Sequence, residues 1–336
     1  MQLDFDQAPF VVALEFTRAC ALVCQHCRAK AQPRRHPQEL SPASGKRLID
    51  AVADMGTLII VLTGGDPLLR NDLPDLIAHA HARGLQVALS PSSTPRVTRA
   101  RPEACRDAGV GRISISLDGS NAATHDDFRG FPGVFDRTLQ ILDLLHDLDL
   151  TVQINTTVCS QNVNELYELY ELYELDEVVA RYHAVMWGVF FLVPIWRGRL
   201  ADIGSAAEHE LIFHWLYDFA PSAPFDVRTT AAPQYRRVLM QRDSAERQQA
   251  CGHAHAGFQF SLGADGILRS ALGVNDGKGF CFVTHLGEIQ PSGFLPVTAG
   301  VFPRDSLAET YRGSPLFKEL RDPSRLGGKC GICEFR

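Results

Sequence analysis

The sequence lacks a long run of basic residues, an apolar segment long enough to span a bilayer, and an N-terminal secretion signal. It carries 33 Lys and Arg against 39 Asp and Glu, a net charge of −6, whereas a nucleic-acid surface needs clustered cations. The most apolar window, 185–195 (VMWGVFFLVPI), is too short for a membrane helix. The N-terminus (MQLDFDQAPF) is acidic where a signal peptide is basic. We therefore expect a cytoplasmic protein that binds neither nucleic acid nor membranes.

A disulfide framework is also missing. Nine Cys is an odd number, and a chain of 336 residues that is 45% hydrophobic can bury a core without covalent staples. Reduced thiols, some of them metal ligands, are the better interpretation.

Apolar strand-like segments alternate with helix-like segments through the first two thirds of the chain. This alternation predicts parallel strands joined by right-handed crossovers. The expected strands are 10–17, 58–63, 85–90, 112–117, 150–158 and 185–193, and the expected helices are 41–54, 71–83, 95–108, 134–148 and 163–181.

One face of several expected strands is polar. In RISISL, Ser114 and Ser116 alternate with Ile113 and Ile115, and successive side chains of a strand point to opposite faces. A sheet covered by helices on both sides would have nearly continuous apolar strands. We therefore expect a partial (β/α)6 TIM-type barrel with a polar lumen. The alternative is a mixed α+β fold with solvated strands.

The pattern changes after about residue 200. We expect the barrel over 1–200, a helical linker over 201–250 and a small C-terminal α+β region over 251–336. Within the last region, GFQFSLGADGILRS predicts a β-hairpin that turns at 264–266.

Three cysteines follow the first expected strand in the segment TRACALVCQHCRAK. Cys20, Cys24 and Cys27 have the spacing C-x3-C-x2-C. They could be buried on one helix face, or bind zinc with His26 as a fourth ligand, although no second ligand hairpin adjoins them. An iron–sulfur cluster is favoured because the loop is basic and because three thiolates leave one iron open for chemistry.

This motif resembles that of the radical S-adenosylmethionine (radical SAM) enzymes. The resemblance covers about 10–195 and implies a [4Fe–4S] cluster whose open iron binds S-adenosylmethionine (AdoMet). It also implies an external one-electron donor of the flavodoxin or ferredoxin type. One electron cleaves AdoMet to a 5′-deoxyadenosyl radical, which abstracts hydrogen from a substrate; the cofactors carry this chemistry and the protein positions them.

Further positions match the family. LTGGDP at the end of the second strand resembles a GGEP-type motif whose backbone meets the methionine amino group, and glycine permits that close approach. Polar strand ends fall where the family contacts ribose and carboxylate, and HDDFRG resembles a segment that brings an Arg there. For each of these the alternative is a satisfied polar strand end or a helix cap. The implied cofactor-binding residues are Gly64, Gly65, Asp66, Pro67, Ser90, Ser92, Ser116, Asp118, Arg129, Asn155 and Thr157.

The C-terminal segment GGKCGICEFR resembles the SPASM/twitch branch of this family, whose members carry auxiliary clusters. Cys330 and Cys333 are implied metal ligands, and Cys281 or Cys251 could complete a site, although Cys281 lies in a strand-like run. Ser292 stands where that branch has a Cys, so one twitch-like cluster is expected rather than two. Zinc is the alternative here.

The resemblance implies an enzyme that modifies a substrate by hydrogen abstraction. A ribosomal peptide is the first hypothesis for the substrate, and a tetrapyrrole side chain is the second. A non-catalytic zinc or iron–sulfur binding module is the alternative of a different class.

Overall fold

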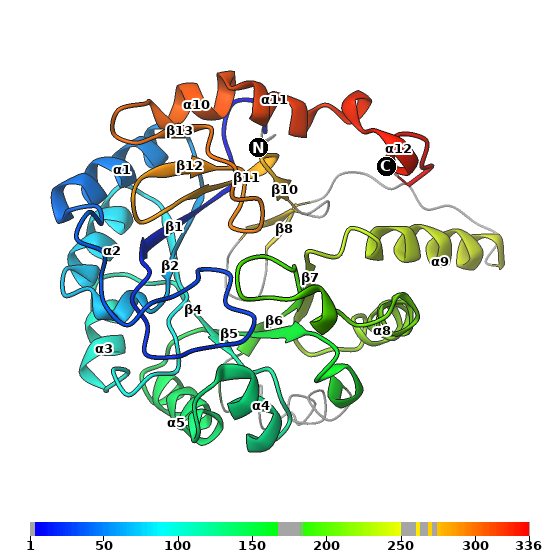
Figure 1. Cartoon of the computed structure of the whole chain (residues 1–336), viewed down its shortest axis with the longest axis horizontal. Coiled ribbons are helices and arrows are strands. Elements are labelled where there is room, and N and C mark those ends of the chain that lie inside the picture. The colour runs from blue at the N-terminus through cyan, green and yellow to red at the C-terminus, as the bar shows by residue number, and fades with distance from the viewer. Residues whose placement is uncertain are drawn as a thin grey trace.

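One large sheet organises the molecule (Figure 1). The computed structural model describes residues 4–166, 182, 184–249, 260–262, 268–270 and 274–335. Seven strands of the sheet are parallel and lie in chain order. They are β1 (Val11–Thr17), β2 (Ile59–Gly64), β3 (Gln86–Leu89), β4 (Arg112–Ser116), β5 (Val152–Val158), β6 (Ala184–Phe191) and β7 (Asp226–Thr230). The expected parallel α/β barrel is confirmed, with one strand beyond the six that were expected.

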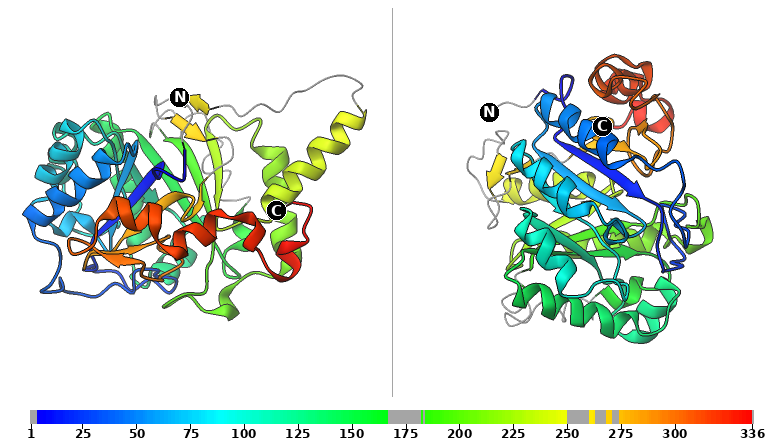
Figure 2. Two further views of the ribbon diagram at one scale, coloured as in Figure 1. Left: turned by 90° about the horizontal axis from the view of Figure 1, so that it is seen from above. Right: turned by 90° about the vertical axis from the view of Figure 1, so that its left-hand side faces the viewer.

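Helices follow the strands and cover the outside of the sheet (Figures 1 and 2). They are α1 (Pro42–Asp54), α2 (Leu73–Ala82), α3 (Ala100–Asp107), α4 (Ala122–Arg129), α5 (Val134–Asp147), α8 (Ala206–Phe219) and α9 (Tyr235–Gln249). Side-chain caps begin several of them: the Ser41 hydroxyl accepts from the Ser44 N–H, and Ser205 forms a capping box with Glu208. None of the helices in the described part of the chain is long and apolar enough to cross a membrane.

Two helical segments differ from the expected helices. The helix α4, which carries Arg129, was not expected, because its segment has a low share of apolar residues and is closed instead by the Asn121 cap and by left-handed Gly130. Most of the expected helix 163–181 lies outside the described residues, which show only the short 3₁₀ turn η2 (Val163–Glu165) at its start.

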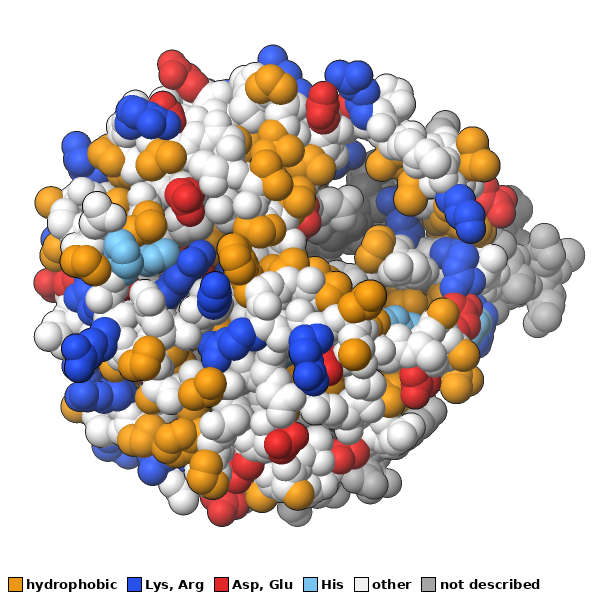
Figure 3. Space-filling view, in the orientation of Figure 1, with side chains coloured by type: hydrophobic (Ala, Val, Ile, Leu, Met, Phe, Trp, Pro, Cys, Tyr) orange, Lys and Arg blue, Asp and Glu red, His pale blue; other side chains and the backbone are white. Residues whose placement is uncertain are grey.

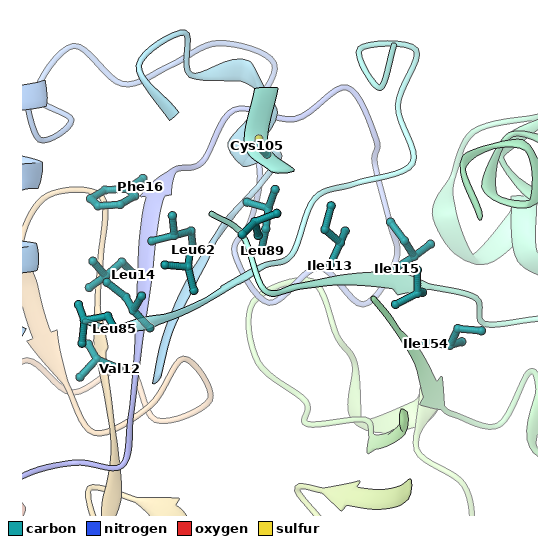
Figure 4. Close-up of a cluster of buried hydrophobic side chains, with 14 of the residues drawn as sticks. Val12, Leu14, Phe16, Leu62, Leu85, Leu89, Cys105, Ile113, Ile115 and Ile154 are labelled. Carbon is teal, nitrogen blue, oxygen red and sulfur yellow. The ribbon is translucent and has the colours of Figure 1, made fainter. Parts of the chain in front are cut away.

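The apolar faces of the strands pack against the helices to form one continuous core. Figure 4 shows Leu14, Leu62, Leu89 and Ile113 aligned across β1 to β4. The opposite faces carry polar side chains that are less completely buried: in β5, Val152, Ile154, Thr156 and Val158 are buried while the residues between them are half-buried. This alternation is the polar lumen that the strand pattern predicted.

The C-terminal region extends the same sheet. Strand β11 (Gly279–Val283) pairs in parallel with β1, and β12 (Glu288–Gln290) and β13 (Gly300–Val301) continue from it as antiparallel strands. The remaining elements are β8 (Phe260–Leu262), β9 (Leu268–Ser270), β10 (Asn275–Asp276), α10 (Leu307–Gly313), α11 (Pro315–Arg321), α12 (Gly328–Gly331) and the 3₁₀ turns η1 (Pro67–Leu69), η3 (Leu200–Asp202) and η4 (Pro323–Arg325). Strands β8 and β9 pair antiparallel on either side of 263–267, which confirms the expected hairpin.

Two boundaries differ from the expected organisation. The segment 201–250, expected to be a helical linker, contains β7, which pairs in parallel with β6 and lengthens the barrel wall. The region after 251 is attached to the barrel edge through the pairing of β11 with β1. The sequence of β7 (DVRTT) is half-polar, so the search for apolar runs did not detect it. The strand-like run around Cys281 was detected, but its pairing with β1 was not.

Candidate functional site

The three cysteines of the loop after β1 lie together at the carboxyl ends of the strands. Cys20 and Cys24 are buried and Cys27 is half-buried, and all three belong to one small apolar cluster with Leu22 and Val134. Because the loop leaves β1 directly at Thr17, the strand fixes where the thiols begin.

Each sulfur receives a hydrogen bond from the protein. The Leu22 N–H donates to Cys20 Sγ (3.4 Å) and the Ala31 N–H donates to Cys27 Sγ (3.3 Å). The Arg129 guanidinium lies 3.9 Å from Cys24 Sγ and donates to it. Donors aimed at sulfur stabilise thiolates, which are the form that binds metals. The chemistry of this donor set fits an iron–sulfur cluster.

Burial raises the pKa of the Cys20 and Cys24 thiols, which therefore release their protons when they bind metal. Among the described residues, no three His, Cys, Asp or Glu side chains are grouped closely enough for a single metal ion. His26, considered above as a fourth zinc ligand, stacks instead on Phe128, with ring centroids 4.0 Å apart.

The glycines that end β2 lie against the backbone of the cysteine loop. A Cβ at Gly64 would be 2.2 Å from the Thr17 carbonyl oxygen, and one at Gly65 would be 2.4 Å from that of Ala19. The Gly65 N–H donates to Thr17 O (2.8 Å), and the Asp66 N–H donates to Ala19 O (2.7 Å). The requirement for two glycines therefore has a cause within the protein, because only glycine lets the two backbones meet.

The side chains after this turn brace the same loop. The Ser92 hydroxyl donates to Gly65 O (2.7 Å) and accepts from the Cys20 thiol (3.5 Å). The Asp66 carboxylate accepts from the Thr94 hydroxyl (2.8 Å) and is fully buried, and this burial raises its pKa. Pro67 begins the 3₁₀ turn η1.

Fully buried Asp118 and half-buried Arg129 form an ion pair beside Cys24. Asp118 also accepts from the Thr157 N–H (2.7 Å), so its carboxylate is occupied within the protein. Burial opposes the charge on Arg129, but Asp118 and Cys24 beside it hold the pKa of the guanidinium above its ordinary value. The pair thus keeps a cation next to one of the three thiols.

The remaining polar candidates line the lumen. Ser116 lies beside Asn155 in register between β4 and β5, and both are half-buried. The Ser90 N–H donates to Leu62 O (2.9 Å) at the end of β3, and Thr157 ends the polar face of β5. The structure therefore brings the barrel candidates to neighbouring strand ends around the cysteine loop.

Sequence reasoning missed a charged network that joins the two ends of the chain. The fully buried Glu15 of β1 accepts from Arg18 Nε (2.8 Å), Arg28 Nη1 (3.5 Å) and His285 Nδ1 (3.1 Å). Burial would raise the pKa of Glu15, but the His285 hydrogen bond and the two arginine charges hold it below its ordinary value. A Glu on an otherwise apolar strand was the available signal, whereas its partner beyond β11 is 270 residues away.

The C-terminal cysteines lie in different surroundings. Cys330 is exposed and Cys333 is half-buried, in and just after the short helix α12. Cys281 is fully buried in β11, where its thiol donates to Gln290 O (3.7 Å) and burial raises its pKa to about 12. Ser292 is buried and accepts from two backbone N–H groups, and Cys251 lies outside the described residues.

Comparisons with known proteins agree with this geometry. A model of the radical SAM superfamily matches residues 14–173. The chain is 38% identical over 329 residues to the AdoMet-dependent heme synthase of Methanosarcina barkeri, a match that covers 98% of this chain and 89% of the relative. The chain therefore belongs to the radical SAM superfamily, and it is an enzyme.

Two further similarities bear on the substrate and on the fold. The chain is 27% identical over 337 residues to the mycofactocin maturase MftC of Mycolicibacterium smegmatis, covering 97% of this chain and 76% of the relative. Streptococcus suis SuiB bound to S-adenosylmethionine matches with a TM-score of 0.74 at 14% identity, covering 98% of this chain and 71% of SuiB. The second likeness concerns the fold alone.

Membership identifies the cofactors of the family, a [4Fe–4S] cluster and AdoMet. The expected fold and class of chemistry are therefore confirmed.

Proposed function

We propose that Cys20, Cys24 and Cys27 are the ligands of three irons of a [4Fe–4S] cluster and that AdoMet is the ligand of the fourth iron. The observation that carries this proposal is that each of the three sulfurs of one loop accepts a hydrogen bond, two from backbone N–H groups of the loop and one from Arg129 of α4. Together the cluster and AdoMet supply one-electron reductive cleavage and hydrogen-atom abstraction from a substrate. The electron comes from an external carrier of the flavodoxin or ferredoxin type.

The protein's own groups position these cofactors. Gly64 and Gly65 fix the loop against β2, and Asp66 and Pro67 hold the turn that follows. Asp118 acts through Arg129, whose guanidinium is the group that can meet an anionic part of AdoMet. Lumen hydroxyls and amides contact the cofactor directly; these are Ser90, Ser92, Ser116, Asn155 and Thr157.

The substrate we propose is a tetrapyrrole whose side chain is modified by hydrogen abstraction. The support is the 38% identity along nearly the whole chain with a heme synthase. Peptide modification, the first hypothesis from the sequence, is the second candidate here. The observation that favours it is the full-length similarity to a maturase, at the lower identity of 27%.

Anaerobic turnover separates the two candidates. Reconstituted enzyme is incubated with AdoMet, a reductant and an iron porphyrin deuterated on its side chains. We expect 5′-deoxyadenosine to form, deuterium to enter it and the porphyrin mass to change. Cleavage of AdoMet without deuterium transfer or a mass change would contradict the tetrapyrrole assignment but leave the radical SAM centre intact.

An auxiliary iron–sulfur cluster at Cys330 and Cys333 is a separate proposal. It rests on the C-x2-C spacing and on the resemblance of the tail to the twitch type. Cys281 is a weak candidate for its third ligand because it is enclosed in β11. Iron analysis of the Cys330→Ala/Cys333→Ala enzyme tests the proposal. If wild type holds more than four irons per chain and the variant holds only four, the proposal is supported. An unchanged iron content contradicts it.

A further inference from the structure

The seventh parallel strand carries an arginine into the barrel lumen. In β7, Val227 packs against the main core, so Arg228, the next residue, faces the opposite side. The partner strand agrees, because Trp187 of β6 is buried against Trp215 and Phe219 of α8 on the helix side.

Arg228 lies in one row of lumen-facing residues that crosses four strands. Ser116 pairs with Asn155, Asn155 with Gly188, and Gly188 with Arg228. The row thus starts at two proposed cofactor positions and ends at a guanidinium on the last parallel strand. A substrate must lie next to the cofactor to react with it. A substrate that extends along this row from the cofactor would reach Arg228.

Gly188 lets the side chains of Asn155 and Phe190 pack directly over the strand between the two ends of the row. A Cβ there would lie 2.5 Å from Asn155 Oδ1 and 3.2 Å from the Phe190 ring. Phe190 and Met186 share the lumen face on either side of Gly188, and both are half-buried. The wall therefore combines an aromatic ring and a thioether with polar groups, because Gln153 Nε2 donates to Asn155 Oδ1 (2.8 Å) and Arg112 Nη1 donates to Met186 Sδ (3.8 Å). The Arg228 cation lies on the neighbouring strand.

Arg228 differs from Arg112 and Arg129 in having no partner within the described part of the chain. It makes no hydrogen bond or ion pair with any described residue. By contrast, Arg112 donates to Gln153 Oε1 (3.3 Å) and Arg129 pairs with Asp118. A half-buried, unpaired guanidinium is suited to binding a carboxylate. The face seen in Figure 3 is hollowed between α9 and the C-terminal helices, near β7.

We propose that Arg228 binds a side-chain carboxylate of the substrate while Phe190 and Met186 contact its planar ring. This inference rests on the proposed function and deepens it, because it names the group by which a carboxylate-bearing tetrapyrrole is held. Arg228 is thus a specificity-determining residue, separate from the residues that hold the cluster.

The test measures binding and turnover in reconstituted holoenzyme. The ligand is a porphyrin with carboxylate side chains, and the comparison ligand is its methyl ester; binding is followed by the porphyrin absorbance. Arg228→Gln should weaken the carboxylate ligand about 10- to 100-fold, the range of one charge-assisted hydrogen bond, and leave the ester unchanged. Arg228→Lys should recover part of the affinity. Arg236→Gln, on the exposed start of α9, is the matched control and should bind as wild type.

The outcomes separate this inference from the proposed function. Substrate-independent cleavage of AdoMet should be equal in wild type and Arg228→Gln, which shows that the variant folds and holds its cofactors. If Arg228→Gln binds the carboxylate porphyrin as wild type does, the inference is wrong and the proposed function stands. If wild-type enzyme binds neither porphyrin, the tetrapyrrole assignment and this inference are both wrong.

Discussion

Two segments of this chain have the same C-x2-C spacing but opposite surroundings. Cys24 and Cys27 follow a barrel strand, and each sulfur there accepts a hydrogen bond. Cys330 and Cys333 lie at a four-residue helix, where Ile332 between them is 87% exposed and neither sulfur accepts a hydrogen bond from a described residue. The spacing permits metal binding in both, but only the first segment is already organised for it.

The difference has an energetic meaning. Donors and packing that are in place before metal binds need not be ordered at that moment, so the proposed cluster site after β1 would bind metal with a smaller entropic cost. The segment with Cys330 and Cys333 would lose that conformational entropy on binding metal, or would need ligands from elsewhere in the chain.

Removing one thiol from each segment should have opposite consequences. We expect Cys24→Ala to abolish reductive cleavage of AdoMet, because one iron of the cluster loses its ligand. Cys333→Ala is the matched control and should retain cleavage at the wild-type rate. The measurement is 5′-deoxyadenosine formed under anaerobic reduction; cleavage by Cys24→Ala at the control rate would refute the ligand assignment.

Thiol reactivity of the metal-free protein should distinguish exposed Cys330 from buried Cys281 and Cys159. Burial raises the pKa of Cys281 to about 12 and that of Cys159 to about 11, so at pH 8 a fraction on the order of 10⁻⁴ of Cys281 is thiolate. We expect iodoacetamide to label exposed Cys330 and to spare both of these, as read by peptide mass spectrometry. Labelling of Cys281 as fast as Cys330 would show that β11 is not closed around it.

An added methyl group should destabilise the protein where β2 meets the cysteine loop and should have little effect on stability next to α12. Gly65→Ala forces a Cβ toward the Ala19 carbonyl, and we expect it to destabilise the protein by about 3 kcal/mol. A Cβ at Gly327 meets nothing within 4 Å, so Gly327→Ala should change stability by less than about 1 kcal/mol. Urea unfolding of both variants checks the pair, and equal midpoints would mean that the β2 turn does not abut the loop.

Acid should lower the free energy of unfolding through His125, which hydrogen-bonds to Asp118 near Cys24. His125 is fully buried, its Nδ1 accepts from the Asp118 N–H (3.0 Å), and burial lowers its pKa to about 3. Between that value and the unfolded pKa near 6.5, the unfolded chain binds the extra proton, so the free energy of unfolding falls as pH falls through this window.

The expected slope from this one group is about 1.4 kcal/mol per pH unit well inside the window. His125→Asn keeps an acceptor for the Asp118 N–H but cannot take up the proton. Urea titrations of the variant between pH 7 and 5 should therefore show a flatter dependence than those of wild type. Parallel curves would show that other groups carry the acid sensitivity.

Prediction from sequence succeeded where the responsible interactions are local. Alternation of apolar and polar residues in β4 and β5 predicted the strands and the lumen, because side-chain direction in a strand depends only on position. It failed at β7, which is half-buried on both faces, and at α4, which is held by its caps and by the ion pair of Arg129 with Asp118. These elements depend on their neighbours more than on their own pattern.

The sequence alone determined the order of strands and helices, the three-thiol loop and the likeness to one family, because all three are written in short, local patterns. Tertiary structure decided the rest. It set His285 against Glu15, placed Arg129 against Cys24 and aligned Arg228 with Asn155 across a glycine. The physical reason is that sheet register and burial bring distant residues together, and no local pattern records which charge will meet which partner.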